Sequence, residues 1–293
     1  MRIANSPVSW GVDHLERPGL PRWEHVFDEI RDAGYTWVEL GAYGFLPADP
    51  HRARQELDRR GLQVAGSYML EPVHDLARRT EVLEGARCVA EYIAGAGGQH
   101  LVIVDWGSPE RGATAGRSDA APRLTAAQQS AYFEVLTAIA DVARETGGLT
   151  ALAHPHAGTW LEFEDEIVDL LQQTDLALCI DTGHFAYAGA DPVALYDQWA
   201  HRVGYLNFKD VDGARLAEAL RRKLSFLEAV DLGVFCSLGD GIVDFRGMRE
   251  ALERHGYDGH ATVEQDRDPR GDTTALEDAR RSLAFLRDVG LAI

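Results

Sequence analysis

Along the chain, short continuous apolar runs alternate with longer stretches in which apolar residues recur every three or four positions. The short runs are typical of parallel strands buried on both faces, and the longer period is typical of amphipathic helices. The pattern predicts strands at residues 2–5, 36–40, 62–67, 100–104, 149–153, 176–181, 204–208 and 259–264. It predicts helices at residues 23–33, 50–60, 73–94, 125–146, 163–173, 192–202, 245–255 and 274–289.

Local signals support several of these boundaries. Asp191-Pro192 combines an N-cap residue with proline at the first helical position, and Gly34, Gly147 and Gly256 stand where helices should end. Eight strands that are each followed by a helix, with no linker between them, predict one α/β domain over residues 1–293, a single (β/α)8 barrel. A doubly wound open sheet is the alternative, but the sequence lacks the Gly-rich turn that binds dinucleotides in such sheets.

One segment departs from the repeat. Residues 213–231 lie between the seventh predicted strand and the seventh predicted helix, and they contain a helical pattern of their own. An extra helical insertion after the seventh strand would lie on the face of the barrel that carries active sites. A substrate lid, a contact in a homo-oligomer and a plain surface helix are all compatible with this pattern.

Composition narrows the range of partners. The formal charge of −18 argues against nucleic acid and against an anionic membrane, because both bind basic surfaces. No apolar run approaches the length that a membrane span requires. Cys88, Cys179 and Cys236 form no CxxC pair, so neither structural zinc nor a disulfide framework is expected. A cytoplasmic protein with a small-molecule substrate fits these properties best.

The strongest chemical signal lies at the ends of the last four predicted strands, where His154, Asp181, Asn207 and Glu264 stand. In a barrel, the carboxyl ends of the strands open on the active site. Imidazole, carboxylate and amide oxygen together suit a divalent ion, and a carboxylate that closes a buried strand is costly unless it is paired or metal-bound. We therefore expect these four side chains to form a metal site, with backbone capping as the alternative role for Asn207.

Further polar and aromatic residues follow the same strands or close other ones. His156, His184 and Lys209 are candidates for proton transfer or substrate contact, although Lys209 could instead form an ion pair with Asp210 or Asp266. Residues that could line a substrate pocket, or have purely structural roles, are Trp10, Glu39, Tyr68 and Trp106. The acidic stretch at residues 162–166 is interpreted as the solvated first turn of a helix.

Six segments, all of them after residue 150, carry a family resemblance. They are His154-Pro155-His156-Ala157-Gly158-Thr159, Asp181-Thr182-Gly183-His184, Phe208-Lys209-Asp210-Val211, Lys223-Leu224-Ser225-Phe226-Leu227-Glu228, Gly239-Asp240-Gly241-Ile242-Val243-Asp244-Phe245-Arg246 and Val263-Glu264-Gln265-Asp266. In these segments the chain resembles the xylose-isomerase-like superfamily of TIM barrels, a group of sugar phosphate isomerases and epimerases. Within the superfamily it is most similar to the inosose (2-keto-myo-inositol) dehydratase group.

The resemblance implies a metal held by side chains from the fifth to eighth strands, where the superfamily usually has glutamate, aspartate, histidine and glutamate. His154 matches the variant found in the inosose dehydratase group, and Asp181 and Glu264 match directly. Asn207 stands where the family pattern has histidine, in a His-Leu-Lys-Asp motif. The implied ion is Mn²⁺ or Co²⁺, with Mg²⁺ and Zn²⁺ as alternatives.

The same resemblance implies a lyase of inositol catabolism that dehydrates a keto-polyol through an enediolate. His184 and Lys209 would serve as acid and base, and His156 would orient the substrate. An enediolate also serves isomerisation, epimerisation and bond cleavage, so another keto-sugar enzyme of this barrel family stays an alternative. A binding or partner subunit without catalysis is the second alternative, and Asn207 is its only sequence hint.

Overall fold

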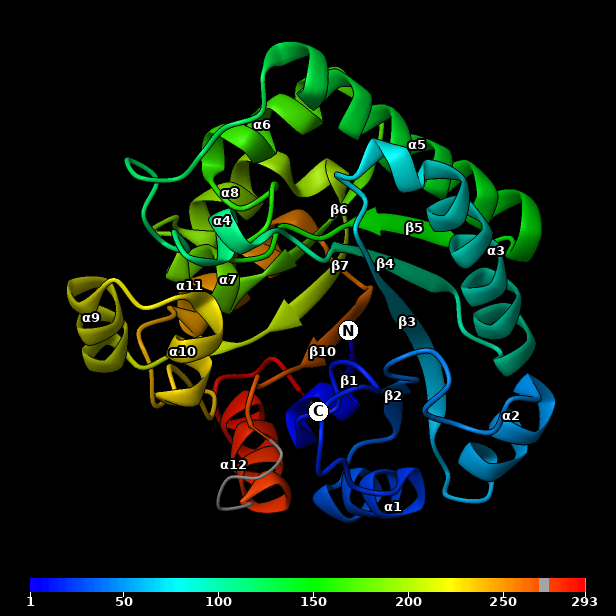
Figure 1. The fold of residues 1–293 in the computed structure, drawn as a ribbon. Coiled ribbons are helices and arrows are strands. Elements are labelled where there is room, and N and C mark those ends of the chain that lie inside the picture. The colour runs from blue at the N-terminus through cyan, green and yellow to red at the C-terminus, as the bar shows by residue number, and fades with distance from the viewer. Residues whose placement is uncertain (269–273, 293) are drawn as a thin grey trace.

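Eight parallel strands close into a barrel in the computed structural model, which describes residues 1–268 and 274–292 (Figure 1). The predicted (β/α)8 barrel is thus confirmed. Each strand pairs with the barrel strand that follows it in the chain, and the last one closes onto the first. In order around the barrel, the strands are β1 (Arg2–Asn5), β2 (Trp37–Glu39), β3 (Gln63–Glu71), β4 (His100–Asp105), β5 (Thr150–Ala153), β6 (Ala177–Asp181), β7 (Val203–Phe208) and β10 (His260–Val263).

Helices surround the barrel (Figure 1). Those that correspond to predicted helices are α1 (Trp23–Ala33), α2 (Pro50–Asp58), α3 (Arg79–Ala96), α5 (Ala126–Gly147), α6 (Glu164–Gln173), α8 (Pro192–Trp199), α11 (Phe245–His255) and α12 (Ala275–Asp288). The structure also contains shorter helical turns that the sequence pattern did not predict as separate elements. They are η1 (Pro7–Trp10), η2 (Leu76–Arg78), α4 (Pro109–Gly112), α7 (Thr182–Tyr187) and η3 (Ala200–Arg202). Strand β3 is longer than predicted, because residues 66–71 stay extended and pair with β4.

Most of the helix-boundary signals act as the sequence predicts. The Asp191 carboxylate accepts hydrogen bonds from the backbone N–H groups of the first turn of α8. Gly34 and Gly256 end α1 and α11 in the left-handed conformation. Helix α5 ends at Gly147, as predicted, and the residue with the positive φ of 65° that caps it is Gly148.

The segment after β7 leaves the barrel and folds on itself. Strand β8 (Asp210–Val211) pairs antiparallel with β9 (Phe235–Cys236), and helices α9 (Gly213–Arg222) and α10 (Phe226–Asp231) lie between them. These elements share a hydrophobic cluster that is separate from the main core. The buried Asp210 carboxylate accepts backbone hydrogen bonds from Val211, Gly239, Gly241 and Val243, which ties the returning loop to the end of β7.

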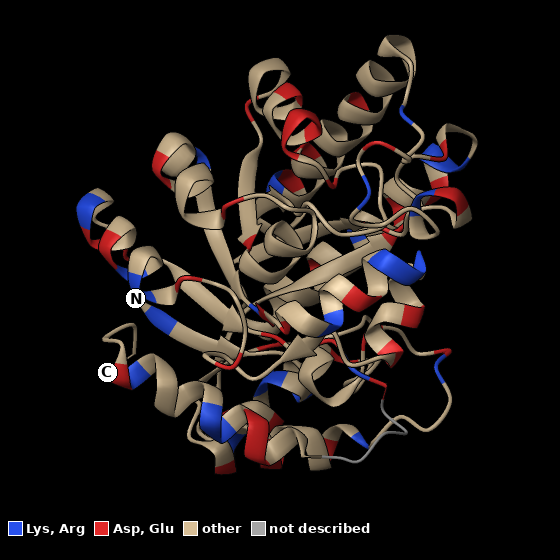
Figure 2. Ribbon diagram, turned by 90° about the vertical axis from the view of Figure 1, so that its left-hand side faces the viewer, with Lys and Arg blue, Asp and Glu red and all other residues tan. Residues whose placement is uncertain are grey.

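Acidic and basic residues are interspersed along the outer helices (Figure 2). Over residues 1–268 and 274–292, no helix is both long enough and apolar enough to cross a membrane.

Gly66 marks the closest approach of two barrel strands, β3 and β4. A Cβ added to Gly66 would lie 2.3 Å from the backbone oxygen of His100, which cannot move without disturbing the ladder. We expect Gly66→Ala to lower the free energy of unfolding by about 2 kcal/mol, as overpacking does. Urea denaturation followed by circular dichroism measures this change.

Gly85→Ala is the matched control, because Gly85 lies inside α3 and its added Cβ would make only an ordinary contact at 3.5 Å. This variant should gain about 0.5–1 kcal/mol from the better helix propensity of alanine. Equal stability of the two variants would contradict the close approach at Gly66.

Candidate active site

Inside the barrel, the inward-facing positions change from apolar to polar toward the carboxyl ends of the strands. Leu152 and Cys179 belong to the buried cluster that fills the barrel. Side chains two residues apart on a strand share one face, so His154 and Asp181 point inward one layer further along. The four residues of the predicted metal site are all buried at this end: His154, Asp181, Asn207 and Glu264.

In the Asp181-Thr182-Gly183-His184 segment, the structure explains why particular residue types stand at their positions. One oxygen of Asp181, Oδ1, accepts the backbone N–H groups of Gly183 and His184 at 2.9 Å, which begins α7 and leaves Oδ2 toward the barrel axis. Thr182 Oγ1 bonds the backbone of Lys209 in both directions. A Cβ on Gly183 would lie 2.5 Å from Lys209 Cγ, so only glycine leaves room for the lysine stem.

Lys209 is the centre of the polar cluster. Its Nζ lies 3.1 Å from Asp181 Oδ2, 3.2 Å from Glu264 Oε2 and 3.1 Å from Asp266 Oδ2. It also lies 3.0 Å from Nε2 of His184. Of the two ion-pair partners considered from the sequence, Asp266 is therefore confirmed. Asp210 is not the partner, because its carboxylate bonds the backbone of the 239–243 loop.

These charges shift one another's pKa values. Burial alone would lower the pKa of the Lys209 ammonium, but Asp181, Asp266 and Glu264 together raise it well above its usual range. Burial also opposes ionisation of Asp181, yet the charge of Lys209 brings the pKa of this carboxyl well below its usual range. Burial and the neighbouring carboxylates raise the pKa of Glu264 instead. Asp181 and Lys209 thus carry the opposite charges at the centre.

Two histidines pack beside this cluster. The rings of His156 and His184 lie 3.7 Å apart between centroids, and both contact Phe226 of α10. Burial lowers the pKa of His156 to about 3 and that of His184 well below its usual value. The Nδ1 atom of His156 bonds the backbone oxygen of Ala157 at 2.9 Å, which leaves Nε2 for other contacts.

The donors around Lys209 fit a divalent ion. Ligand atoms of His154, Asp181 and His184 lie within 4.8 Å of one another, and all three residues are buried. Neither ring nitrogen of His154 has a hydrogen-bond partner, whereas buried polar atoms normally have one. An ion coordinated here would satisfy His154, and Glu264 reaches the same space because its Oε2 contacts Lys209 Nζ. The geometry therefore suits the predicted divalent metal, and it adds His184 to the possible donors.

A small inner cavity of about 60 Å³ adjoins these groups, and Asn207, Glu39 and Tyr68 line it. Cys179 Sγ lies 3.7 Å from the amide oxygen of Asn207. Glu39 accepts a hydrogen bond from Thr262, and burial raises the pKa of its carboxyl. The Tyr68 hydroxyl donates to the backbone oxygen of Asp13 at 2.6 Å. Glu39 and Tyr68 thus line a cavity beside Lys209, and a substrate role for them stays a prediction.

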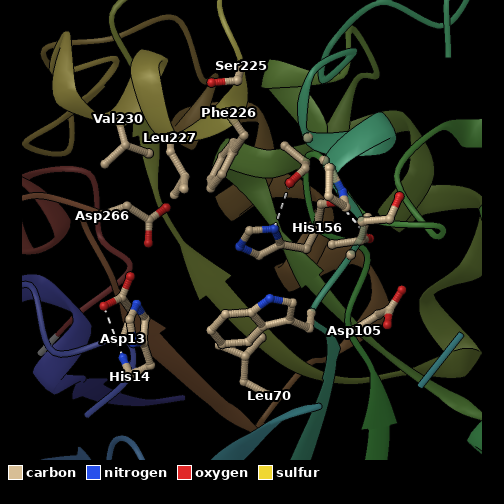
Figure 3. Close-up of a pocket in the computed structure, with 18 of the residues that line it drawn as sticks. Asp13, His14, Leu70, Asp105, His156, Ser225, Phe226, Leu227, Val230 and Asp266 are labelled. Atoms are coloured by element: carbon tan, nitrogen blue, oxygen red, sulfur yellow. Dashed lines mark hydrogen bonds between the residues drawn. The ribbon is translucent and has the colours of Figure 1, made fainter. Parts of the chain in front are cut away.

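A larger outer cavity of about 410 Å³ lies beside the inner one and shares Asp13, His156 and Asp266 with it (Figure 3). Trp106 and residues of α10 line this cavity. A substrate role for Trp106 and a lid role for the segment after β7 stay predictions. Trp10, in contrast, packs in the hydrophobic core, where its Nε1 donates to Glu29. The role of Trp10 as a pocket residue finds no support in this placement.

The interpretation of residues 162–166 as a solvated turn is wrong for two of its carboxylates. Glu162 and Glu166 are buried, and both face the guanidinium of Arg111, which is fully buried as well. Glu162 also accepts the backbone N–H groups of Gly116 and Gly158, so it ties the loop after β5 to the loop after β4. A charge run alone cannot show that an arginine 50 residues earlier pairs with it.

The sequence analysis did not select Asp13 as a site residue, and it named Asp266 only as a possible ion-pair partner of Lys209. Both line the inner and the outer cavity, and Asp266 contacts Lys209 directly. The one available signal for Asp266 was its place two residues after Glu264. Asp13 comes from the loop after η1, where the sequence has no strand-end pattern to mark it.

Comparisons with known proteins agree with this architecture. Residues 27–289 match the family described as xylose isomerase-like TIM barrel. The chain is 32% identical to an inosose dehydratase of Geobacillus kaustophilus, covering 92% of this chain and 88% of that protein. It is 33% identical to the rhizopine catabolism protein MocC of Rhizobium meliloti, covering 92% and 82%. A solved structure of L-ribulose 3-epimerase superposes with a TM-score of 0.73 at 18% identity, covering 99% and 94%. The matches confirm the resemblance and, with it, the prediction of an enzyme of this group.

Replacing Lys209 with methionine tests the charge balance of the cluster. We expect Lys209→Met to lower the free energy of unfolding by about 3 kcal/mol at pH 8, because it leaves buried carboxylates without their cation. The loss should be smaller at pH 5. Without Lys209, the already raised pKa values of Glu264 and Asp266 rise further, and these carboxyls then favour the folded state while they are protonated. Denaturant unfolding at both pH values measures the difference.

Lys223→Met is the control, since it removes the only other lysine, which is exposed at the end of α9. Its stability should match that of the unmodified protein at both pH values. A loss in Lys209→Met that does not change with pH would show that the lysine stabilises the fold by packing rather than by charge.

Proposed function

Because this chain belongs to the xylose isomerase-like TIM barrel family, we propose that it is a metal-dependent hydro-lyase that removes water from a keto-polyol such as 2-keto-myo-inositol. Its relatives support this reaction class, since the 32% identical protein is named inosose dehydratase. The observation that carries the proposal is the contact of 3.0 Å between Lys209 Nζ and His184 Nε2, beside donors that suit a metal ion. The contact joins two proton carriers at the place where the ketone would bind.

The ion would be held by His154, Asp181 and Glu264, with Asn207 as a fourth donor. When bound, a divalent metal polarises a ketone and makes the adjacent C–H more acidic. Nitrogen and oxygen donors without sulfur suit Mn²⁺ or Co²⁺. An amide at position 207, in place of imidazole, shifts the preference toward ions that favour oxygen ligands, among which Mg²⁺ is the alternative.

Side chains of the protein would carry out the proton transfers. Loss of water requires one group to take a proton from the carbon next to the ketone and another to protonate the departing hydroxyl. His184 and Lys209 are placed for these roles, and their contact lets the proton taken by one pass to the other. The C–H bond and the C–O bond break, a carbon–carbon double bond forms, and the proton leaves with the hydroxyl as water. His156 borders the same space and offers Nε2 to orient the substrate.

The proposal is tested by incubating the protein with 2-keto-myo-inositol and Mn²⁺ or Co²⁺. We expect loss of water, visible as the absorbance of the conjugated product, and we expect a chelator to abolish it until the ion is returned. His184→Gln should lower kcat by at least ~100-fold, as the loss of a general acid–base group does.

Full activity of the metal-free protein would contradict the metal dependence. Deuterium uptake from D₂O without loss of water would indicate the alternative reaction class, an epimerase or isomerase. For this reason the assay follows solvent exchange by NMR as well as product absorbance.

Asn207 can be tested through metal affinity alone. We expect Asn207→His to raise the affinity for Mn²⁺ or Co²⁺ by about tenfold, which corresponds to about 1.4 kcal/mol, because imidazole is the stronger donor. Asn207→Ala should lower it. Calorimetric titration of the metal-free protein measures both changes, and equal affinities in all three proteins would show that residue 207 is not a ligand.

A further inference from the structure

The inner and outer cavities adjoin each other, because they share lining residues. The inner one, about 60 Å³, reaches Lys209, and the outer one, about 410 Å³, extends away from it. Both are lined by Val8, Asp13, Leu70, His156 and Asp266, which therefore mark the boundary between them. A polyol ring whose ketone lies at Lys209 would reach this boundary and leave most of the outer cavity unfilled.

Apolar side chains form two facing sides of the outer cavity. Phe226, Leu227 and Val230 from α10 lie on one side, and Leu70 lies across from them (Figure 3). Trp106 also lines the cavity. Leu227 is 62% exposed and Trp106 is 51% exposed, so these apolar surfaces are open to an incoming molecule.

These sides do not match a substrate that is polar all round. Hydroxyl groups gain nothing by leaving water for contact with Leu227 or Trp106, whereas apolar carbon does. The carboxylates of Asp13 and Asp266, in contrast, lie at the boundary with the inner cavity, where they can accept hydrogen bonds from polyol hydroxyls. The cavity thus has a polar end at Lys209 and an apolar end at α10.

We infer, on the basis of the proposed function, that the substrate is a keto-polyol or keto-sugar that carries a planar apolar substituent, such as an aryl ether or aryl glycoside. The ketone end of the polyol lies at the inner cavity and its ring extends into the outer one, where the aryl group lies between α10 and Leu70 with Trp106 beside it. Two observations favour a flat ring over an alkyl chain. Phe226 and Trp106 supply aromatic surface, and the Trp106 ring is itself held edge-on by His14 at 5.4 Å between centroids.

The inference is tested by binding, which does not depend on turnover. The methyl ether and the benzyl ether of myo-inositol share one polar part and differ only in the substituent. We expect the benzyl ether to bind at least about tenfold more tightly to the metal-loaded protein, as burial of a phenyl ring implies. Leu227→Asp should remove most of that difference. Isothermal titration calorimetry reports the binding.

Ile242→Asp is the matched control, because Ile242 is 55% exposed and lies outside both cavities. It should leave the affinity for both ethers unchanged. Equal affinities for the two ethers, or an equal loss of both in Leu227→Asp, would overturn the inference. Failure of the proposed function would give a different result. The protein would then remove water from no keto-polyol, while the two ethers would still differ in affinity.

Discussion

A full ammonium charge inside a barrel is the constraint on which the rest of this site depends. Removing an ion from water costs several kcal/mol even after relaxation, so Lys209 can be buried only because Asp181, Glu264 and Asp266 surround it. The carboxylates need the cation equally, since they would otherwise repel one another at this distance. The same convergence of oxygen atoms suits a divalent ion, the other kind of positive charge that this site could hold under the proposed function.

The barrel and the position of its site could be predicted from the chain because both depend on local patterns. Buried parallel strands give continuous apolar runs, and a strand end is marked where the run meets a polar residue. His154 and Asp181 follow this rule, each two residues after an apolar side chain inside the barrel. The exception is β3, whose end depends on pairing with β4 rather than on its own sequence.

Contacts between loops could not be predicted, because they do not depend on local sequence patterns. Whether Glu162 lies in solvent or against Arg111 depends on how two loops meet, and no spacing in the sequence encodes that meeting. Trp10 and Trp106 both follow strands, yet one packs into the core and the other lines a cavity. The orientation of such a side chain is set by neighbours distant in sequence, so residue type alone leaves both outcomes open.

The segment between β7 and α11 lines the outer cavity, whereas the charged residues around Lys209 follow the barrel strands. Its helices pack in a hydrophobic cluster of their own, and Asp210 joins the returning loop to the end of β7. At exposed positions such as Leu227, helix α10 can therefore acquire new side chains without disturbing the strands that position Lys209 and its carboxylates. Evolution could in this way exchange the molecules that the barrel accepts while the reaction at its centre is inherited unchanged.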